Sequence, residues 1–177
     1  LTSHEQVLEI GRLGHRVFGK LGTLGVPSFA FVNGASMGGG LEVALHCTYR
    51  TVSTAAPAIA LPEVFLGLIP GWGGTALLPR IAGLDNAVTV ILENPLSNNR
   101  MLKPAQAVEL GVADALIEAA DFDEQSLAWT AAVVKGQIAV ERPTATDEEA
   151  TRAIARAETL VAARTKGVPP APQRALD

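Results

Sequence analysis

One stretch, residues 29–45 (FAFVNGASMGGGLEVAL), constrains the fold of this chain more than any other. Its first four residues are apolar and predict a buried strand, which Asn33 and Gly34 end. Three consecutive glycines, residues 38–40, then open a helix rich in alanine, leucine and valine. Because a helix start presents unpaired N–H groups and a partial positive charge, this stretch predicts a backbone site for developing negative charge.

Two glutamates flank this predicted helix start. Glu42 lies one turn into the helix, and Glu63 lies in the apolar sequence ALPEVFLG, just before a second glycine-rich turn, PGWGGT. Each glutamate also has an interpretation without a catalytic role. A glutamate in a first helical turn is usually there because its charge complements the helix dipole, and Glu63, which follows Pro62, could be an exposed surface residue. The triple glycine, the offset of Glu42 and the pattern PE-x-x-LG-x-x-PG-x-GG together favour an oxyanion hole flanked by two carboxylates.

Length, charge and cysteine content limit the classes of function. The 177 residues suffice for one domain with a core, or for one domain with an appendage. A net charge of −4 gives no electrostatic footprint for nucleic acid or an anionic membrane, and no apolar run approaches membrane-spanning length. Cys47 is the only cysteine, so we expect no intrachain disulfide and a reducing, cytoplasmic compartment.

The order of strands and helices predicts an α/β fold with a mostly parallel sheet. The expected strands span residues 29–32, 49–53, 58–61 and 112–117. The expected helices span residues 7–24, 84–92, 104–111, 123–135 and 147–166, with a further short helix starting at Gly73 and Gly74. We expect Pro79 to confine that short helix to its first turn or to kink it, and Asn94-Pro95 to close the next helix. The proline-rich tail, residues 167–177, predicts an extended segment until its last residues.

Ser36 lies in a G-x-S-x-G pattern between a strand and a helix, as a hydrolase nucleophile does. Such a serine needs a basic partner, normally histidine. His46 is expected to face away down the helix, and the two other histidines lie upstream, on the first helix. We therefore interpret Ser36 as a turn residue and rank a serine peptidase last.

Three further patterns carry little weight. GWGGTA fits a loose dinucleotide-binding pattern, but prolines before and after it spoil the required strand–turn–helix unit. GASMGGG lacks the lysine and hydroxyl residue of a phosphate-binding loop. His46 and Cys47 have no partner at metal-ligand spacing, so we predict packing roles for both and no metal site.

Three strings, VNGASMGGGLEVAL, LPEVFLGLIPGWGGTALLPRIAG and LKPAQAVELGVADALI, resemble the crotonase (enoyl-CoA hydratase/isomerase) superfamily over residues 26–117. The resemblance implies a crotonase-like (ClpP/crotonase) ββα-repeat fold with a parallel sheet, followed by C-terminal helices. It also implies acyl-CoA thioester substrates and a homo-oligomer, a trimer or a dimer of trimers. No cofactor is expected, because the substrate itself carries coenzyme A.

The resemblance also implies roles for individual residues. The two catalytic glutamates of the family fall on Glu42 and Glu63, and its helix-side oxyanion donor falls on the N–H of Gly39. The expected substrate-binding residues are Gly38, Gly71 and Trp72. A tryptophan in such a turn is more often a packing or interface residue, so Trp72 has both interpretations.

Two carboxylates favour hydration of an enoyl-CoA thioester, in which one activates water and the other delivers a proton. The alternatives are an enoyl-CoA isomerase or another CoA-thioester enzyme, and an inactive fragment that acts as an oligomerisation module. Residues 1–118 are predicted to be the latter part of a crotonase core whose N-terminal part is missing upstream of Leu1. Residues 119–177 are predicted to be a helical oligomerisation or linker segment, similar to the junction with a 3-hydroxyacyl-CoA dehydrogenase in multifunctional β-oxidation proteins.

Overall fold

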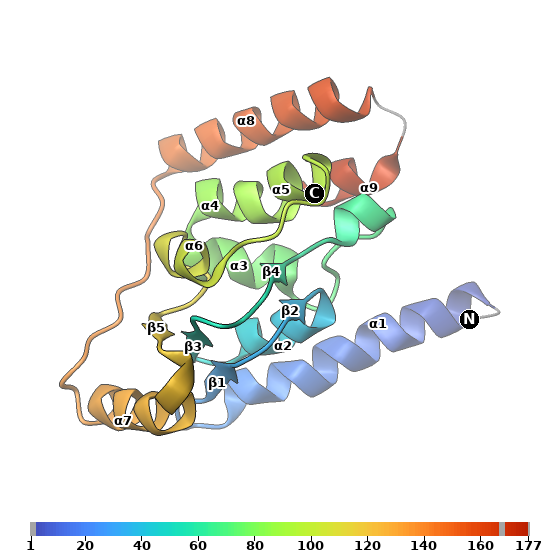
Figure 1. Ribbon diagram of the computed structural model, residues 1–177. Helices are drawn as coiled ribbons and strands as arrows, with labels where there is room; N and C mark the ends of the chain where they lie inside the picture. The colour runs from blue at the N-terminus through green and yellow to red at the C-terminus, as the bar shows by residue number, and fades with distance from the viewer. Residues whose placement is uncertain (1–2, 167–168, 177) are drawn as a thin grey trace.

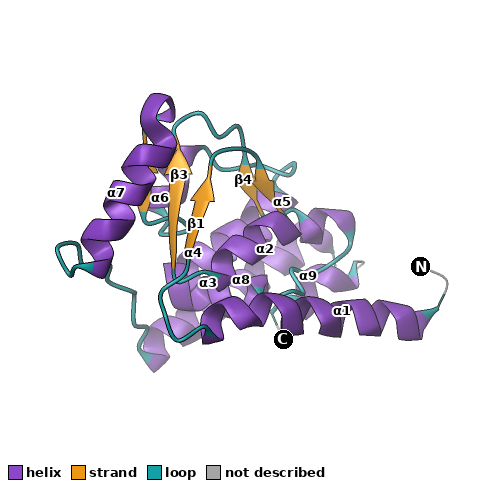
Figure 2. Ribbon diagram, turned by 90° about the horizontal axis from the view of Figure 1, so that it is seen from below, coloured by secondary structure: helices purple, strands orange, loops and turns teal. Residues whose placement is uncertain are grey.

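The computed structural model describes residues 3–166 and 169–176. Within these residues, short parallel strands form two small sheets packed among helices (Figures 1 and 2). The strands are β1 (Phe29–Val32), β2 (Ser36–Met37), β3 (Tyr49–Ser53), β4 (Ile59–Ala60) and β5 (Ala115–Ile117). The α-helices are α1 (His4–Phe18), α2 (Gly39–His46), α3 (Gly74–Ala82), α4 (Leu84–Val88), α5 (Asn94–Leu96), α6 (Pro104–Glu109), α7 (Phe122–Val134), α8 (Asp147–Thr165) and α9 (Pro170–Arg174). Shorter turns are the 3₁₀ helices η1 (Gly19–Thr23), η2 (Glu63–Leu66) and η4 (Ala119–Asp121) and the π-helix η3 (Thr89–Glu93).

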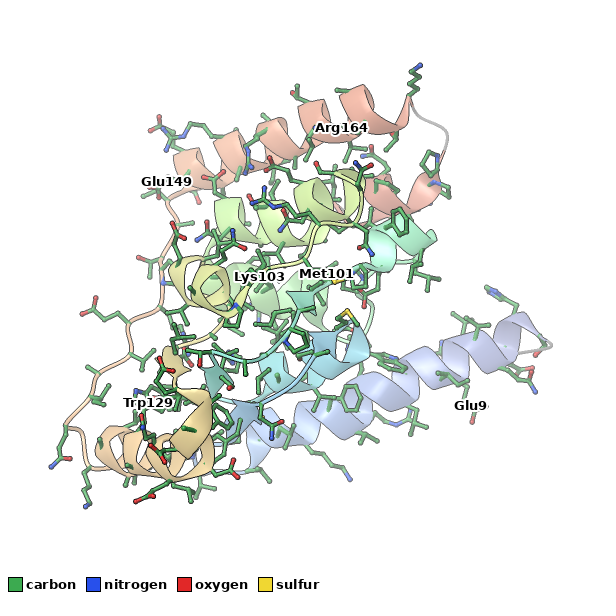
Figure 3. The ribbon with its side chains drawn as sticks, in the orientation of Figure 1. Glu9, Met101, Lys103, Trp129, Glu149 and Arg164 are labelled. Atoms are coloured by element: carbon green, nitrogen blue, oxygen red, sulfur yellow. The ribbon has the colours of Figure 1, made fainter. Side chains whose placement is uncertain are left out.

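The sheet order is β1-β3-β5, with every pair parallel, and β2 pairs in parallel with β4. Alternate residues of β1 point to opposite faces, as strand geometry requires. On one face, Phe29 packs against Trp129 of α7, and Phe31 packs against the start of the same helix. Trp129 is labelled in Figure 3. On the other face, Ala30 and Val32 pack on the apolar core. The predicted α/β fold with parallel strands is therefore confirmed.

The core continues from the sheet into stacked helices, and α8 lies along α4 at the outer edge of Figure 1. Ala157 and Val161 of α8 belong to the same buried cluster as Leu41 and Leu45 of α2. The start of α8 is fixed by a capping box between Thr146 and Glu149. The boundary at residue 118 stays a prediction, although the helix beyond it shares the core of the residues before it.

Two prolines lie inside helices that the sequence predicted them to limit. Pro79 is the sixth residue of α3, which continues to Ala82. The helix that begins at Leu84 continues through Pro95 to the end of α5. Directly before Pro95, the N–H of Asn94 donates to the carbonyl of Thr89, five residues back. This wide turn shifts the hydrogen-bond register by one residue just before the proline, which has no N–H to donate.

The prediction of an extended tail was wrong, because residues 170–174 form helix α9. Pro170 and Pro172 occupy its first turn, where N–H groups have no partner inside the helix, so a proline there removes no hydrogen bond. Ala171 and Pro172 are buried. The parts of the predicted tail that lie outside the described residues are Gly167, Val168 and Asp177.

Helix α1 and the following 3₁₀ turn confirm the helix predicted over residues 7–24. The N-terminal end of α1 projects beyond the body of the molecule (Figures 1 and 2). Along the whole of α1, the apolar residues Val7, Ile10, Leu13 and Val17 are 41–49% exposed. No helix among the described residues is both long and apolar enough to cross a membrane.

Candidate functional site

Glu42 is buried in the first turn and a half of α2 and faces the turn that precedes α3. Its Oε1 atom accepts hydrogen bonds from the N–H of Trp72, at 2.7 Å, and of Gly74, at 2.9 Å. Because both donors are backbone groups in one turn, Oε1 acts only as an acceptor. The Oε2 atom is the carboxylate oxygen that remains to take up a proton.

The turn around Trp72 approaches Glu42 so closely that glycine is required. A Cβ atom on Gly74 would lie 2.6 Å from Cβ of Pro70 and 3.2 Å from Oε1 of Glu42. Gly73 has a φ of +123°, a backbone conformation that residues with side chains rarely adopt. The glycine-rich turn of the GWGGTA string therefore supports the Glu42 carboxylate.

Glu63 begins the 3₁₀ turn η2 and is also buried. Among the described residues, none donates a hydrogen bond to its Oε2 atom. Burial raises the pKa of the Glu63 carboxyl, the hydrogen bond from its own backbone N–H lowers it, and the negative charge of Glu42 adds to the rise. Gly38 lies beside this carboxyl, since a Cβ there would lie 3.0 Å from Oε1 of Glu63.

One cavity of about 350 Å³ brings together five of the six predicted site residues. They are Gly39, Glu42, Glu63, Gly71 and Trp72. Val7, Ile10, Leu68 and Ile69 add apolar wall, so the carboxylates face a largely apolar space. The N–H of the first residue of α2 has no acceptor inside its helix, which leaves it available at the cavity edge.

Trp72 packs with its indole between two helices, in a slot made by two glycines. A Cβ on Gly14 of α1 would lie 2.4 Å from the indole ring, and one on Gly39 would lie 2.9 Å from it. Phe18 meets the indole edge-on, with ring centroids 5.4 Å apart. The ring of Trp72 thus packs between helices and also lines the cavity, and its role in substrate binding stays a prediction.

The far end of α2 is anchored by a buried guanidinium group. Arg50 of β3 donates to the carbonyls of Ala44, at 3.4 Å, and Cys47, at 2.7 Å, where the helix ends. It is 1% exposed and forms an ion pair with Asp114, at 3.3 Å. A cation at a helix C-terminus complements the helix dipole. Arg142 pairs with the other oxygen of Asp114, so the loop before α8 is tied to the same anchor.

The structure gives Ser36 no role in this site. It lies in β2 rather than in a turn, which corrects the prediction, and its N–H donates to the carbonyl of Ala58. Nε2 of His46 lies 2.8 Å from the carbonyl oxygen of Trp72. Among residues 3–166 and 169–176, no group of three acidic, histidine or cysteine side chains is placed to hold a metal ion.

The sequence-based prediction did not identify Gly14, which lies against the Trp72 indole, and it gave His46 only a general packing role. A glycine inside a helical pattern signals close packing, and Gly14 could have been singled out on that ground. The bond from His46 to a backbone carbonyl carries no sequence signal, because the two residues are 26 positions apart.

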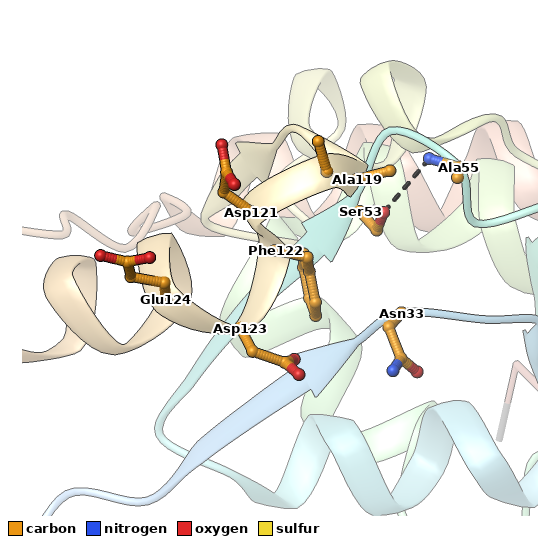
Figure 4. Close-up of a pocket in the computed structure, with 9 residues that line it drawn as sticks. Asn33, Ser53, Ala55, Ala119, Asp121, Phe122, Asp123 and Glu124 are labelled. Carbon is orange, nitrogen blue, oxygen red and sulfur yellow. Dashed lines mark hydrogen bonds between the residues drawn. The ribbon is translucent and has the colours of Figure 1, made fainter.

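A second cavity, of about 490 Å³, lies at the start of α7 (Figure 4). Its rim carries the carboxylates of Asp121, Asp123 and Glu124, and Ser53 lies at its wall with Oγ accepting from the N–H of Ala55. Neither glutamate of the first cavity lines it. It is a polar, acidic hollow, without the apolar wall that a fatty acyl group requires.

Comparison with known proteins agrees with this geometry. The family model described as Enoyl-CoA hydratase/isomerase matches residues 10–166. The chain belongs to the enoyl-CoA hydratase/isomerase family. The match extends the resemblance of residues 26–117 to include the part of α1 from residue 10 onward and all of α8.

Relatives of this hydratase/isomerase family member include the fatty acid oxidation complex subunit alpha of Idiomarina loihiensis, 38% identical over 170 residues. That alignment covers 92% of this chain and 23% of the relative. The protein of the same name from Pseudomonas savastanoi pv. phaseolicola is 43% identical over 120 residues, 67% of this chain and 16% of the relative. The chain thus spans about a quarter or less of these relatives.

Solved structures similar to this family member include the enoyl-CoA hydratase of Bacillus anthracis, with a TM-score of 0.66 and 27% identity. The similarity covers 75% of this chain and 49% of that one. Pseudomonas aeruginosa DspI gives a TM-score of 0.67 at 30% identity, covering 76% of this chain and 53% of that one. These similarities confirm the predicted crotonase-like fold.

Proposed function

We propose that this chain carries the catalytic carboxylates of an enoyl-CoA hydratase, which adds water across the 2,3 double bond of an acyl-CoA thioester in fatty-acid β-oxidation. One observation carries the proposal: Glu42, Glu63 and the start of α2 line a single, largely apolar cavity. The names of the relatives, which refer to fatty acid oxidation, support the same pathway.

The start of α2 supplies the stabilisation of charge. When water adds to the β-carbon, negative charge develops on the thioester oxygen, and the N–H of Gly39 is the donor proposed for it. One such donor contributes about 3 kcal/mol in comparable sites. Because Gly38 and Gly71 have no side chains, they would present only backbone to the thioester.

The two glutamates divide the proton transfers. Oε1 of Glu42 is held by two N–H donors, so the carboxylate presents Oε2 to water as a base. The raised pKa of Glu63 keeps its carboxyl protonated over a wider pH range, which suits delivery of a proton to the α-carbon. This assignment favours hydration over isomerisation, which commonly uses one carboxylate.

Assembly and compartment belong to the proposal as well. Exposed apolar residues along α1 support a homo-oligomer, which we propose to be a trimer or a dimer of trimers. The free thiol of Cys47 supports a reducing compartment, which we propose to be the cytoplasm. Coenzyme A enters as part of the substrate, and a following 3-hydroxyacyl-CoA dehydrogenase domain stays a prediction. Light scattering of the purified protein measures the assembly directly.

The test is loss of the enoyl absorbance of crotonyl-CoA, measured on the 177-residue chain and on the native polypeptide that contains it. Glu42→Gln and Glu63→Gln should each lower the rate about a hundredfold or more, whereas Ser36→Ala should leave it unchanged. A product with a shifted double bond instead of a 3-hydroxyacyl group would identify an isomerase. Stable oligomers without turnover in either form would favour the assembly-module alternative, and labelling of Ser36 by a fluorophosphonate would favour a peptidase.

A further inference from the structure

His46 is the last residue of α2, four positions after Glu42, so the two side chains lie on the same face of the helix. Its Nε2 atom lies 2.8 Å from the carbonyl oxygen of Trp72. Because a carbonyl oxygen can only accept, Nε2 must carry the proton in this contact. Neither the proposed proton transfers nor the oxyanion hole uses this histidine.

The contact matters because it completes a clamp on one residue. Trp72 donates its N–H to Glu42 Oε1 at 2.7 Å, and its carbonyl accepts from His46 on the other side. His46 also leaves no room for a side chain on the next residue, because a Cβ on Gly73 would lie 2.7 Å from His46 Nε2. Both peptide groups of Trp72 are therefore fixed to one face of α2.

Fixing the backbone of Trp72 also fixes its indole. The ring lies against Gly39, the residue whose N–H is the proposed oxyanion donor. Phe18 faces both partners edge-on, with ring centroids 5.4 Å from Trp72 and 6.0 Å from His46. If the carbonyl of Trp72 loses its partner, the ring is free to move over the cavity, and one of the two donors that hold Glu42 moves with it.

We propose that His46 is a positioning residue: by hydrogen-bonding the Trp72 carbonyl, it holds the Trp72 indole against Gly39 and the Trp72 N–H against Glu42. It contributes no atom to the reaction. The structural part of the inference concerns only this chain, and the catalytic part rests on the proposed hydratase function.

The structural part is tested by fluorescence of the 177-residue chain with Trp129→Phe, which leaves Trp72 as its only tryptophan. His46→Gln keeps an N–H donor at a similar reach, whereas His46→Met fills a similar volume without a donor. We expect His46→Met to shift the Trp72 emission to longer wavelength and His46→Gln to leave it as in the parent. His46→Asn, whose amide is too short to reach the carbonyl, replaces the methionine variant if circular dichroism shows that the latter is unfolded.

The catalytic part is tested by hydration of crotonyl-CoA in the native polypeptide. His46→Met should lower kcat about tenfold and change KM less than about threefold, because misplacement of Glu42 affects the transition state more than binding. His46→Gln should restore most of kcat. Unchanged emission and kcat in His46→Met would overturn the proposal, as would a glutamine variant that behaves like methionine in both measurements.

Failure of the two proposals can be told apart. If the parent polypeptide does not hydrate crotonyl-CoA, the proposed function is wrong. The emission of the methionine and glutamine variants then decides alone whether His46 positions Trp72.

Discussion

The two glutamates of the site are both buried, yet their surroundings differ in kind. Glu42 is 2% exposed and its Oε1 atom accepts from two backbone N–H groups. Glu63 is 8% exposed, and among the described residues nothing donates to its Oε2 atom. One carboxylate is part of the framework that holds α2 and the turn before α3 together. The other has one oxygen, Oε2, buried with no donor among the described residues, which carries a desolvation cost.

This difference indicates that Glu42 contributes to the stability of the fold as well as to the proposed catalysis. A buried acceptor bonded to two donors stabilises the fold, because removing it leaves both donors unpaired. Replacing the Glu63 carboxyl by an apolar group should cost little stability, because its Oε2 atom has no donor among the described residues to leave unpaired. Equal roles in catalysis, as proposed here, therefore go with unequal roles in stability.

The largest effect should come from Glu42→Leu, which removes the acceptor of both N–H groups. Unpaired buried donors cost about 1–3 kcal/mol each, so we expect the free energy of unfolding to fall by about 3 kcal/mol. The measurement is urea unfolding followed by circular dichroism. Glu63→Leu is the matched variant at the other carboxyl and should leave stability unchanged or increase it.

Glu42→Gln separates the structural role of Glu42 from its chemical one. The amide oxygen still accepts from both N–H groups, so stability should stay near that of the parent while hydration falls. Equal destabilisation by Glu42→Leu and Glu63→Leu would contradict the contrast between the two carboxyls.

The next largest effect concerns the packing that supports Glu42. Gly14→Ala places a methyl group 2.4 Å from the indole of Trp72, so ring or helix must shift. Overpacking of this kind costs about 1–3 kcal/mol. Gly11→Ala, one turn earlier in the same helix, has nothing within 4 Å and should stabilise α1 by about 1 kcal/mol. Thermal unfolding of the two variants measures the difference, and a Gly14→Ala protein as stable as Gly11→Ala would show that α1 does not hold the ring.

Much of this contrast could not be predicted from the sequence. The order of strands and helices predicted the parallel strands, because periodicity is a local signal. The pairing of Glu42 and Glu63 at one site came from their spacing around the glycine-rich turns and from the family resemblance. The two donors to Glu42 come from a turn thirty or more residues away, which only the packing of α3 on α2 determines. Helix α9 was missed for a local reason, since its prolines occupy only the first turn, where they are tolerated.

A smaller effect is expected beside Glu63. Gly38 has a φ of +55°, and a Cβ there would lie 3.0 Å from Oε1 of Glu63. Gly38→Ala should therefore cost about 1–2 kcal/mol of backbone strain and displace the Glu63 carboxyl. We expect a larger relative loss in the rate of hydration than in the free energy of unfolding, with both measured on the same preparation. Gly34→Ala, with nothing within 4 Å of its added methyl and φ outside the positive range, is the control. Equal loss of hydration in both variants would contradict a specific effect on Glu63.

The smallest effect is the contribution of Glu63 to the dependence of stability on pH. Its pKa is raised in the folded state, mainly by burial and further by the charge of Glu42, against the lowering effect of its own backbone N–H. The folded protein therefore holds this proton more tightly than the unfolded chain does. The resulting stabilisation is fully present below the unfolded pKa of about 4.5 and is lost as the pH rises through the raised folded pKa.

Glu63→Gln removes this titration while keeping the shape of the side chain. The free energy of unfolding should then fall less steeply than in the parent as the pH rises from about 4 to about 7, and at the upper end the variant should be the more stable of the two. Glu42→Gln is the control for a glutamate-to-glutamine change at the carboxyl that accepts from two N–H groups. Parallel pH profiles for the parent and Glu63→Gln would mean that the folded protein holds the Glu63 proton no more tightly than the unfolded chain does. The proposed division of proton transfer between the two glutamates would then lose its physical basis.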